Sequence, residues 1–177
     1  MLSNKTYKFW FCTGSQDLYG DECLRKVAEH SAKMVEALNA SDKIEYEIVL
    51  KPTLISQASI RQTLNDANND PECAGVITWC HTFSPAKMWI LGLKEFKKPL
   101  CHLHTQFNEE LPYDTIDMDF MNENQSAHGD REYGHIVSRM GIEREIIVGH
   151  WANEKVQERI GSWMTTAIGE IGRASCR

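Results

Sequence analysis

The fold is decided by the N-terminal stretch Tyr7-Lys-Phe-Trp-Phe-Cys12 and by the loop that follows it, Thr13-Gly-Ser-Gln-Asp-Leu-Tyr-Gly20. The first part is a short apolar run rich in aromatic residues, which is typical of a buried strand. The second part is polar and carries two glycines. In α/β proteins, a loop at this place often binds a ligand. The stretch therefore predicts a strand that leads directly into a candidate binding loop.

The same alternation of strand and helix signals continues along the chain. Short runs rich in Val, Ile, Phe and Trp predict strands at residues 7–12, 45–50, 74–79, 99–104 and 145–149. Apolar residues at three- and four-residue spacing predict helices at residues 22–38, around 60–67, after Pro85 and after Asn153. Five such units imply an α/β fold with a parallel sheet of about five strands covered on both faces. This is the three-layer, doubly wound (flavodoxin/Rossmann-like) arrangement, and we expect the flavodoxin-like strand order.

Composition narrows the class of protein. The 177 residues fit one domain with a sizeable core. The net charge of -6 argues against partners such as nucleic acid or an anionic membrane, since both need a basic surface. No apolar run reaches about 18 residues, and the first residues lack a secretory signal pattern. The cysteines at 12, 23, 73, 80, 101 and 176 form no C-x-x-C pair. We therefore expect buried free thiols in a cytoplasmic protein.

Ligands of doubly wound folds bind beyond the carboxyl ends of the strands. The candidate site is thus made by residues 13–20, 79–85 and 104–108 and by the stretch after Gly149. The sequence has neither a Walker A motif nor G-x-G-x-x-G, so nucleotide binding has no motif support. Gly14 could still allow close backbone approach to an anion, which leaves a flavodoxin-like phosphate or flavin binder as an alternative.

Two further patterns carry candidate chemistry. In Cys101-His-Leu-His104 the two histidines share one strand face, and Cys80 and His81 could add metal ligands, but the four-ligand spacing is incomplete. Hydrogen bonding to neighbours is the alternative role. If residues 116–134 are helical, a polar face gathers Met121, Gln125, His128 and Glu132. From the residues alone, this face either meets a ligand or is solvated.

Several blocks together resemble the bacterial L-arabinose isomerase family. They are Gly14-Ser-Gln-Asp-Leu-Tyr-Gly20, His81-Thr-Phe-Ser-Pro-Ala-Lys-Met-Trp89, His104-Thr-Gln-Phe-Asn108, Ile116-Asp-Met-Asp-Phe-Met-Asn122 and Asn124-Gln-Ser-Ala-His-Gly-Asp-Arg-Glu132. The resemblance covers residues 7–168 and only the N-terminal domain of that enzyme. One departure is Asp17, where the family is expected to carry His. Residues 1–170 are taken as this domain, and residues 171–177 as a tail left by truncation, a frameshift or cloning.

The resemblance implies an isomerase that converts L-arabinose to L-ribulose with a divalent metal, usually manganese. Its metal ligands and catalytic groups would lie in later domains, so it implies no catalytic residue and no metal ligand within this chain. It also implies a homo-oligomer, a hexamer built from two trimers, with active sites between subunits. The chain alone is then expected to be inactive. A stand-alone sugar-binding or self-association module without catalysis is the alternative.

The family's substrate-binding residues match five positions here. By resemblance, Gln16, Gln125 and His128 would hydrogen-bond the sugar hydroxyls of L-arabinose or L-ribulose. Leu18 and Phe83 would pack on the carbon face of the sugar. The polar face of the 116–134 segment is therefore expected to meet a ligand, and His102 and His104 are expected to be structural.

Overall fold

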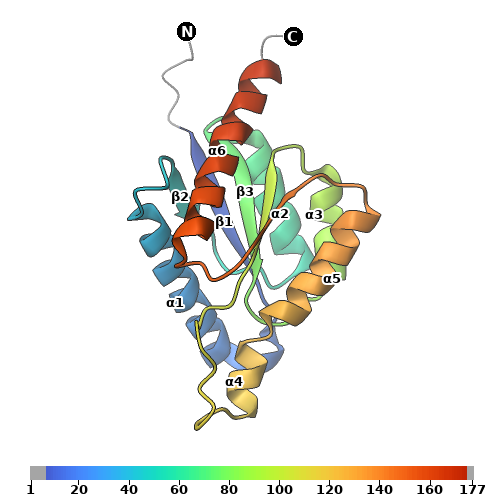
Figure 1. Cartoon of the computed structure of the whole chain (residues 1–177). Helices are drawn as coiled ribbons and strands as arrows, with labels where there is room; N and C mark the ends of the chain where they lie inside the picture. Colours follow the sequence, from blue (N-terminus) through green and yellow to red (C-terminus); the bar gives the residue numbers. More distant parts are fainter. Residues whose placement is uncertain (1–6, 175–177) are drawn as a thin grey trace.

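The computed structural model describes residues 7–174, which form a sheet with helices on both faces (Figure 1). The elements, in chain order, are β1 (Lys8–Gly14), η1 (Asp17–Tyr19), α1 (Gly20–Asn39), β2 (Glu47–Leu50), α2 (Gln57–Asn69), β3 (Cys73–Cys80), η2 (Ala86–Trp89), α3 (Ile90–Glu95), β4 (Leu100–His104), α4 (Met118–Glu123), α5 (Ser126–Arg139), β5 (Glu145–Val148) and α6 (Glu154–Ala174). Residues 1–6 and 175–177, and with them Cys176, lie outside the described part.

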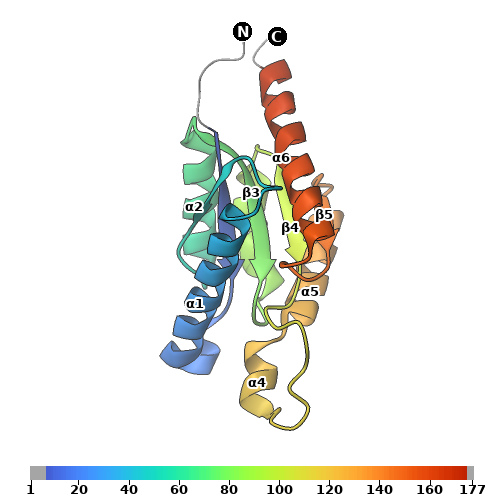
Figure 2. The ribbon, with the colours of Figure 1, turned by 60° about the vertical axis from the view of Figure 1, so that its left-hand side comes forward.

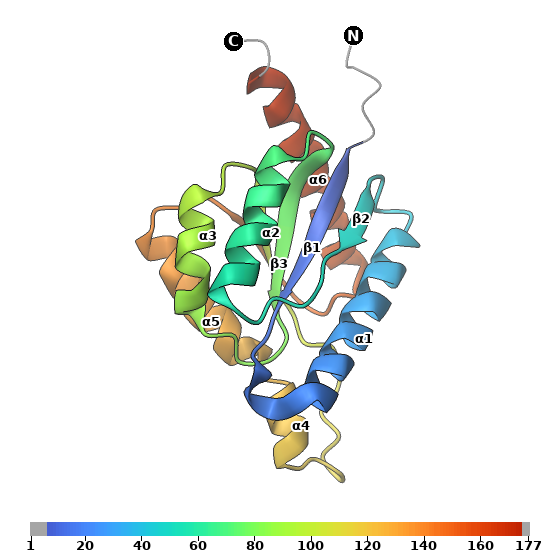
Figure 3. The same cartoon turned by 180° about the vertical axis from the view of Figure 1, so that it is seen from behind.

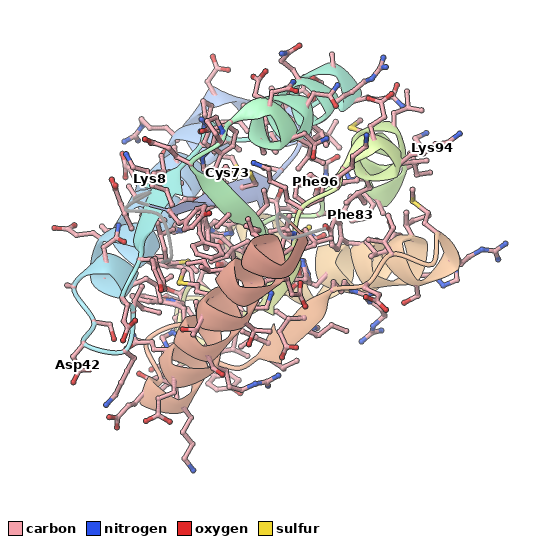
Figure 4. All side chains as sticks on the ribbon, turned by 90° about the horizontal axis from the view of Figure 1, so that it is seen from above. Lys8, Asp42, Cys73, Phe83, Lys94 and Phe96 are labelled. Atoms are coloured by element: carbon pink, nitrogen blue, oxygen red, sulfur yellow. The ribbon has the colours of Figure 1, made fainter. Side chains whose placement is uncertain are left out.

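The sheet has five parallel strands in the order β2-β1-β3-β4-β5. This is the flavodoxin-like order, and it confirms the predicted fold class and all five predicted strands. The order in which strands are added to the sheet reverses between β1 and β3, so the topological switch point lies at the carboxyl ends of these two strands. Figure 4, which views the sheet along its strands, shows Lys8 and Cys73 side by side at the amino ends, as their pairing requires.

Each face of the sheet has its own apolar core. One face packs against α1 and α6, and the other against α2, α3 and α5 (Figures 2 and 3). Both cores receive side chains from β1, because successive side chains of a strand point to opposite faces of the sheet. Phe9 and Phe11 belong to the first core, whereas Trp10 and Cys12 belong to the second. Strand β3 is buried along its whole length, as expected for a central parallel strand covered on both sides.

The helices follow their sequence signals closely. Ser56 caps α2 in a capping box, in which its hydroxyl accepts from the Ser59 N–H at 3.1 Å. Asn153 precedes α6, and its side-chain oxygen accepts from the Lys155 N–H at 3.0 Å. Every helix among residues 7–174 is too short or too polar to cross a lipid bilayer.

The segment 116–134 is not one helix, and this corrects the expectation of a single polar face. Asp117 caps α4 by accepting from the Phe120 N–H at 2.8 Å, and Asn124 then ends this helix with φ -112° and ψ 51°. The Asn124 side chain donates to the Phe120 carbonyl at 2.9 Å, a local bond that competes with helix continuation. Met121 therefore belongs to α4, whereas His128 and Glu132 belong to α5.

Candidate functional site

The loop after β1 is held firmly at the carboxyl edge of the sheet. The Ser15 N–H donates to the Leu54 carbonyl at 3.0 Å, and the Leu54 N–H donates to the Thr13 carbonyl at 2.8 Å. The hydroxyls of Thr13 and Ser31 lie 2.8 Å apart, which ties the loop to α1. Because the Ser15 N–H already has a partner, this part of the loop does not offer the free amide that an anion nest needs.

Gly14 serves close packing between two loops. A Cβ atom at this position would lie 2.8 Å from both Ser84 Oγ and Trp89 Cζ2, closer than side chains tolerate. The hydroxyls of Ser15 and Thr82 add a hydrogen bond of 2.8 Å across the same junction. Glycine therefore brings the β1 loop against the loop after β3, which carries Phe83, and no anion is needed to explain it.

Of the five expected sugar-binding residues, the structure joins two by a direct contact. The rings of Phe83 and His128 lie 4.8 Å apart between centroids, at an angle of 41°. His128 is exposed and Phe83 is half-buried, so both rings remain accessible. Phe83 also lines a groove of about 810 Å3 that continues between η2 and α5.

The other three expected residues lie on segments at the same edge of the sheet. Gln125 lies at the joint of α4 and α5, and its amide donates to Asn122 Oδ1 at 3.4 Å. Gln16 is largely buried in the β1 loop, whereas Leu18 stands in η1 with 76% of its surface exposed. An ion pair of 2.6 Å between Lys26 Nζ and Glu123 Oε1 joins α1 to α4. The start of α1 and α4 together form one end of the molecule (Figure 3).

Sequence reasoning missed the contacts that place α5. The Ser126 hydroxyl donates to the His81 carbonyl at 3.0 Å, and the Cys80 N–H donates to Asp130 Oδ1 at 3.3 Å. Gly129 packs so closely that an added Cβ would lie 2.9 Å from the Thr82 carbonyl oxygen. The only signal for these contacts in the sequence is the helical spacing of small and polar residues at 126, 129 and 130.

The two strand histidines turn toward Asp130 of α5. His102 Nε2 lies 2.8 Å from Asp130 Oδ1, and His104 Nε2 lies 3.5 Å from Asp130 Oδ2. The other ring nitrogen of His102 is 2.9 Å from the Thr78 hydroxyl. The geometry thus shows His102 in the alternative role of hydrogen bonding to its neighbours, whereas His104 makes only a longer contact with the same carboxylate.

The neighbouring thiols are poor candidates for metal ligands. Burial raises the pKa of the Cys80 thiol well above its usual value, and the nearby Asp130 carboxylate raises it further. Burial likewise raises the pKa of Cys101. A thiol binds metal as the thiolate, which these surroundings disfavour. Among residues 7–174, no three His, Cys, Asp or Glu side chains lie close enough together to hold a metal ion.

A second histidine pair, His30 and His81, joins α1 to the end of β3. His30 Nδ1 and His81 Nε2 are 2.7 Å apart, and His30 stacks on Phe107 with 3.6 Å between ring centroids. Burial, with a smaller contribution from the neighbouring His30, lowers the pKa of His81 to about 4. Burial, followed by the Lys33 charge, lowers the pKa of His30 to about 4 as well. Both rings are therefore neutral at pH 7, and one donates to the other.

Comparison with known proteins gives this geometry a family. The family model described as "L-arabinose isomerase N-terminal domain" matches residues 3–174. L-arabinose isomerase of Halalkalibacterium halodurans is 62% identical over 167 residues, which are 94% of this chain and 34% of the relative. Those of Geobacillus thermodenitrificans and Thermotoga neapolitana are each 56% identical and are also covered to 34%, over 95% and 94% of this chain.

The matched relatives extend well beyond the region that they share with this chain, which spans about a third of their length. The matched region runs from residue 3, ahead of β1, to residue 174 at the end of α6. The chain therefore belongs to the family of L-arabinose isomerase N-terminal domains.

Proposed function

We propose that this chain forms one wall of the sugar site in an L-arabinose isomerase, an aldose–ketose isomerase that converts L-arabinose to L-ribulose. The observation that carries the proposal is the accessible Phe83–His128 pair at the carboxyl edge of the sheet. This is the edge where doubly wound folds bind ligands. Family membership supplies the substrate class, and the relatives are named for this sugar.

The side chains around the pair fit a sugar. His128, Gln125 and Gln16 offer hydrogen-bonding groups, which suit the alternating donor and acceptor demands of hydroxyls. Phe83 and Leu18 offer apolar surface, which suits the C–H face of a sugar ring. In this proposal the first three residues bind hydroxyls and the other two exclude water from the carbon face.

The chemistry of the isomerisation would require groups from outside this chain. The reaction moves a proton between C1 and C2 through an enediol, and needs an acid and a base near these carbons. A divalent metal such as manganese, when bound, would polarise the sugar oxygens. The side chains of residues 7–174 do not fit such an ion, as their metal-ligating groups are too dispersed. We therefore place both the manganese ligands and the acid–base groups beyond this chain.

The exposed apolar side chains support a partner at the site end. Leu18, Leu111, Tyr113, Met118 and Met121 are all exposed, Tyr113 to 80%. They lie on η1, on α4 and on the loop before α4, which project beyond the sheet (Figure 2). The start of β1 and the end of α6 lie at the opposite end of the molecule (Figure 1). We propose that this end docks on another subunit of a homo-oligomer, a hexamer of two trimers, and completes that subunit's sugar site.

The cellular compartment proposed for the enzyme is the cytoplasm. Support comes from the cysteines of the described residues, Cys12, Cys23, Cys73, Cys80 and Cys101, which are buried thiols without disulfide partners. Buried thiols of this kind are common in the reducing cytosol.

Activity measurements test the proposal directly. The purified 177-residue chain, given manganese and L-arabinose, is expected to form no L-ribulose. A chimera in which this chain replaces the N-terminal third of the Halalkalibacterium halodurans relative is expected to be active, because the shared region is 62% identical. Ribulose formation by the chain alone would contradict the proposal, and so would an inactive but correctly folded chimera.

A second candidate is a self-association or sugar-binding module without catalysis, and the same exposed apolar side chains favour it. Calorimetric titration of the chain with L-arabitol separates the two. Tight binding by the chain alone would indicate a binding module, since an incomplete site lacks most of its contacts. The first proposal predicts no measurable heat.

A further inference from the structure

Polar contacts and one close glycine approach hold the start of α5 against the carboxyl end of β3. We name this junction the α5 seam, made by Ser126, Gly129 and Asp130 on the helix and residues 80–84 of the β3 end. Two hydrogen bonds cross the seam. The Ser126 hydroxyl donates to the His81 carbonyl at 3.0 Å, and the Cys80 N–H donates to Asp130 Oδ1 at 3.3 Å. Directional bonds of this kind fix the position of a helix more tightly than apolar contact alone does.

Gly129 lies at the centre of the seam. An added Cβ would lie 2.9 Å from Thr82 O, 3.0 Å from Cys80 Cβ and 3.3 Å from Ser84 N. Thr82 and Ser84 are the two chain neighbours of Phe83, and Gly129 is the chain neighbour of His128. The absence of a side chain at 129 therefore determines how closely the backbone that carries Phe83 approaches the backbone that carries His128.

Asp130 secures the same turn from the other side. Its carboxylate is buried, and besides the Cys80 N–H it meets His102 Nε2 at 2.8 Å. His102 is anchored in turn by the Thr78 hydroxyl of β3 at 2.9 Å. The turn of α5 that bears His128 is thus bonded to both β3 and β4, while the His128 ring itself stays exposed.

We propose that Gly129 is a positioning residue of the sugar site, which with Ser126 and Asp130 holds the His128 ring against the Phe83 ring. The inference deepens the proposed function and rests on it for the identity of the ligand. Gly129 touches no sugar in this account. It sets the spacing of the two rings that do.

Substituting two glycines of α5 tests the spacing. Gly129→Ala inserts a methyl group into the seam. Gly134→Ala, on the same helix, is the matched control, because its Cβ would meet only Arg144 Nη2 at an ordinary 3.5 Å. Both changes favour the helix equally by propensity. The readout is the NMR cross-relaxation peak between the Phe83 and His128 rings, measured against the Phe9–Trp163 pair on the other face of the sheet.

The two variants are expected to differ. Gly129→Ala should weaken the Phe83–His128 peak relative to the Phe9–Trp163 peak, and Gly134→Ala should leave both unchanged. A folded Gly129→Ala protein that keeps both peaks would overturn the proposal. If Gly129→Ala does not fold, Ser126→Ala takes its place, since it removes one seam hydrogen bond without adding an atom. An unaltered ring peak in that variant would overturn the proposal equally.

Kinetics in the Halalkalibacterium halodurans chimera separates this inference from the proposed function. Gly129→Ala is expected to raise KM for L-arabinose about threefold to tenfold, which corresponds to the loss of one hydrogen bond. A weakened ring peak with an unchanged KM would support the positioning role of Gly129 but contradict the assignment of Phe83 and His128 to the sugar site. An unchanged ring peak would contradict the positioning role of Gly129, whatever value KM takes.

Discussion

The carboxylate of Asp130 on α5 is the common partner of His102 and His104, the two histidines of β4. The sequence predicts that His102 and His104 share one face of a strand, because side chains alternate along strands. It cannot show that their partner is an acid 28 residues beyond His102 on a helix, because this contact depends on how α5 crosses the sheet. With that partner in place, His102 is hydrogen-bonded to α5, and His104 lies beside the same carboxylate.

The His30–His81 pair predicts a pH dependence of stability. The pKa of each histidine is 6.5 in the unfolded chain and about 4 in the folded protein, so the unfolded chain binds protons more readily. The contribution of this pair to the free energy of unfolding should therefore be largest above pH 6.5, fall as the pH drops toward 4, and level off below about pH 4. The contribution of the buried His81 is on the order of 3 kcal/mol. Urea unfolding at successive pH values measures it.

Two substitutions show whether this pair is responsible. His81→Phe keeps an aromatic ring beside Trp79, which stacks on His81 at 4.6 Å, and removes the titrating nitrogens. The loss of stability between pH 6.5 and pH 4 should then be smaller. His135→Ala, at an exposed histidine of α5, should leave the pH profile unchanged. Equal profiles for the wild-type and His81→Phe proteins would show that other groups carry the dependence.

Among the elements, the pair α4 and α5 shows where sequence periodicity is insufficient. Residues 116–134 keep a helical spacing, yet the chain turns at Asn124 because a cap at Asp117 and local side-chain bonding favour a short helix. The break separates Met121 from His128 and places Gln125 at the start of α5. Long apolar runs and stripes, by contrast, predicted the strands and the other helices well, since burial in a central layer leaves a strong pattern.

The capping box of α2 provides a prediction for an element remote from the site. Ser56→Ala removes the hydroxyl that accepts from the Ser59 N–H at 3.1 Å. It should lower the free energy of unfolding by about 1 kcal/mol, the usual cost of a lost helix cap. Gln57→Ala, at the exposed first residue of the helix, is the control and should change little. Equal stabilities of the two variants in urea would show that the cap is dispensable.

At the scale of the whole molecule, the sheet order brings together loops that are distant in the sequence. The loop after β1, the loop after β3 and the start of α5 meet because β1 and β3 are adjacent in the sheet and α5 packs beside them. The strand order could be expected from crossover handedness. The Phe83–His128 contact could not, since it depends on close approach at Gly129, a property of packing that one glycine in a sequence does not reveal.

The central claim is that this chain supplies sugar-binding side chains to an isomerase larger than itself. The most direct test is KM for L-arabinose in the Halalkalibacterium halodurans chimera, compared between His128→Ala and His135→Ala. Both changes remove an exposed histidine from α5, and only the His128 ring pairs with the Phe83 ring in the proposed sugar wall. The account predicts that His128→Ala raises KM about threefold to tenfold and that His135→Ala leaves it unchanged. Equal KM values for the two variants would contradict it.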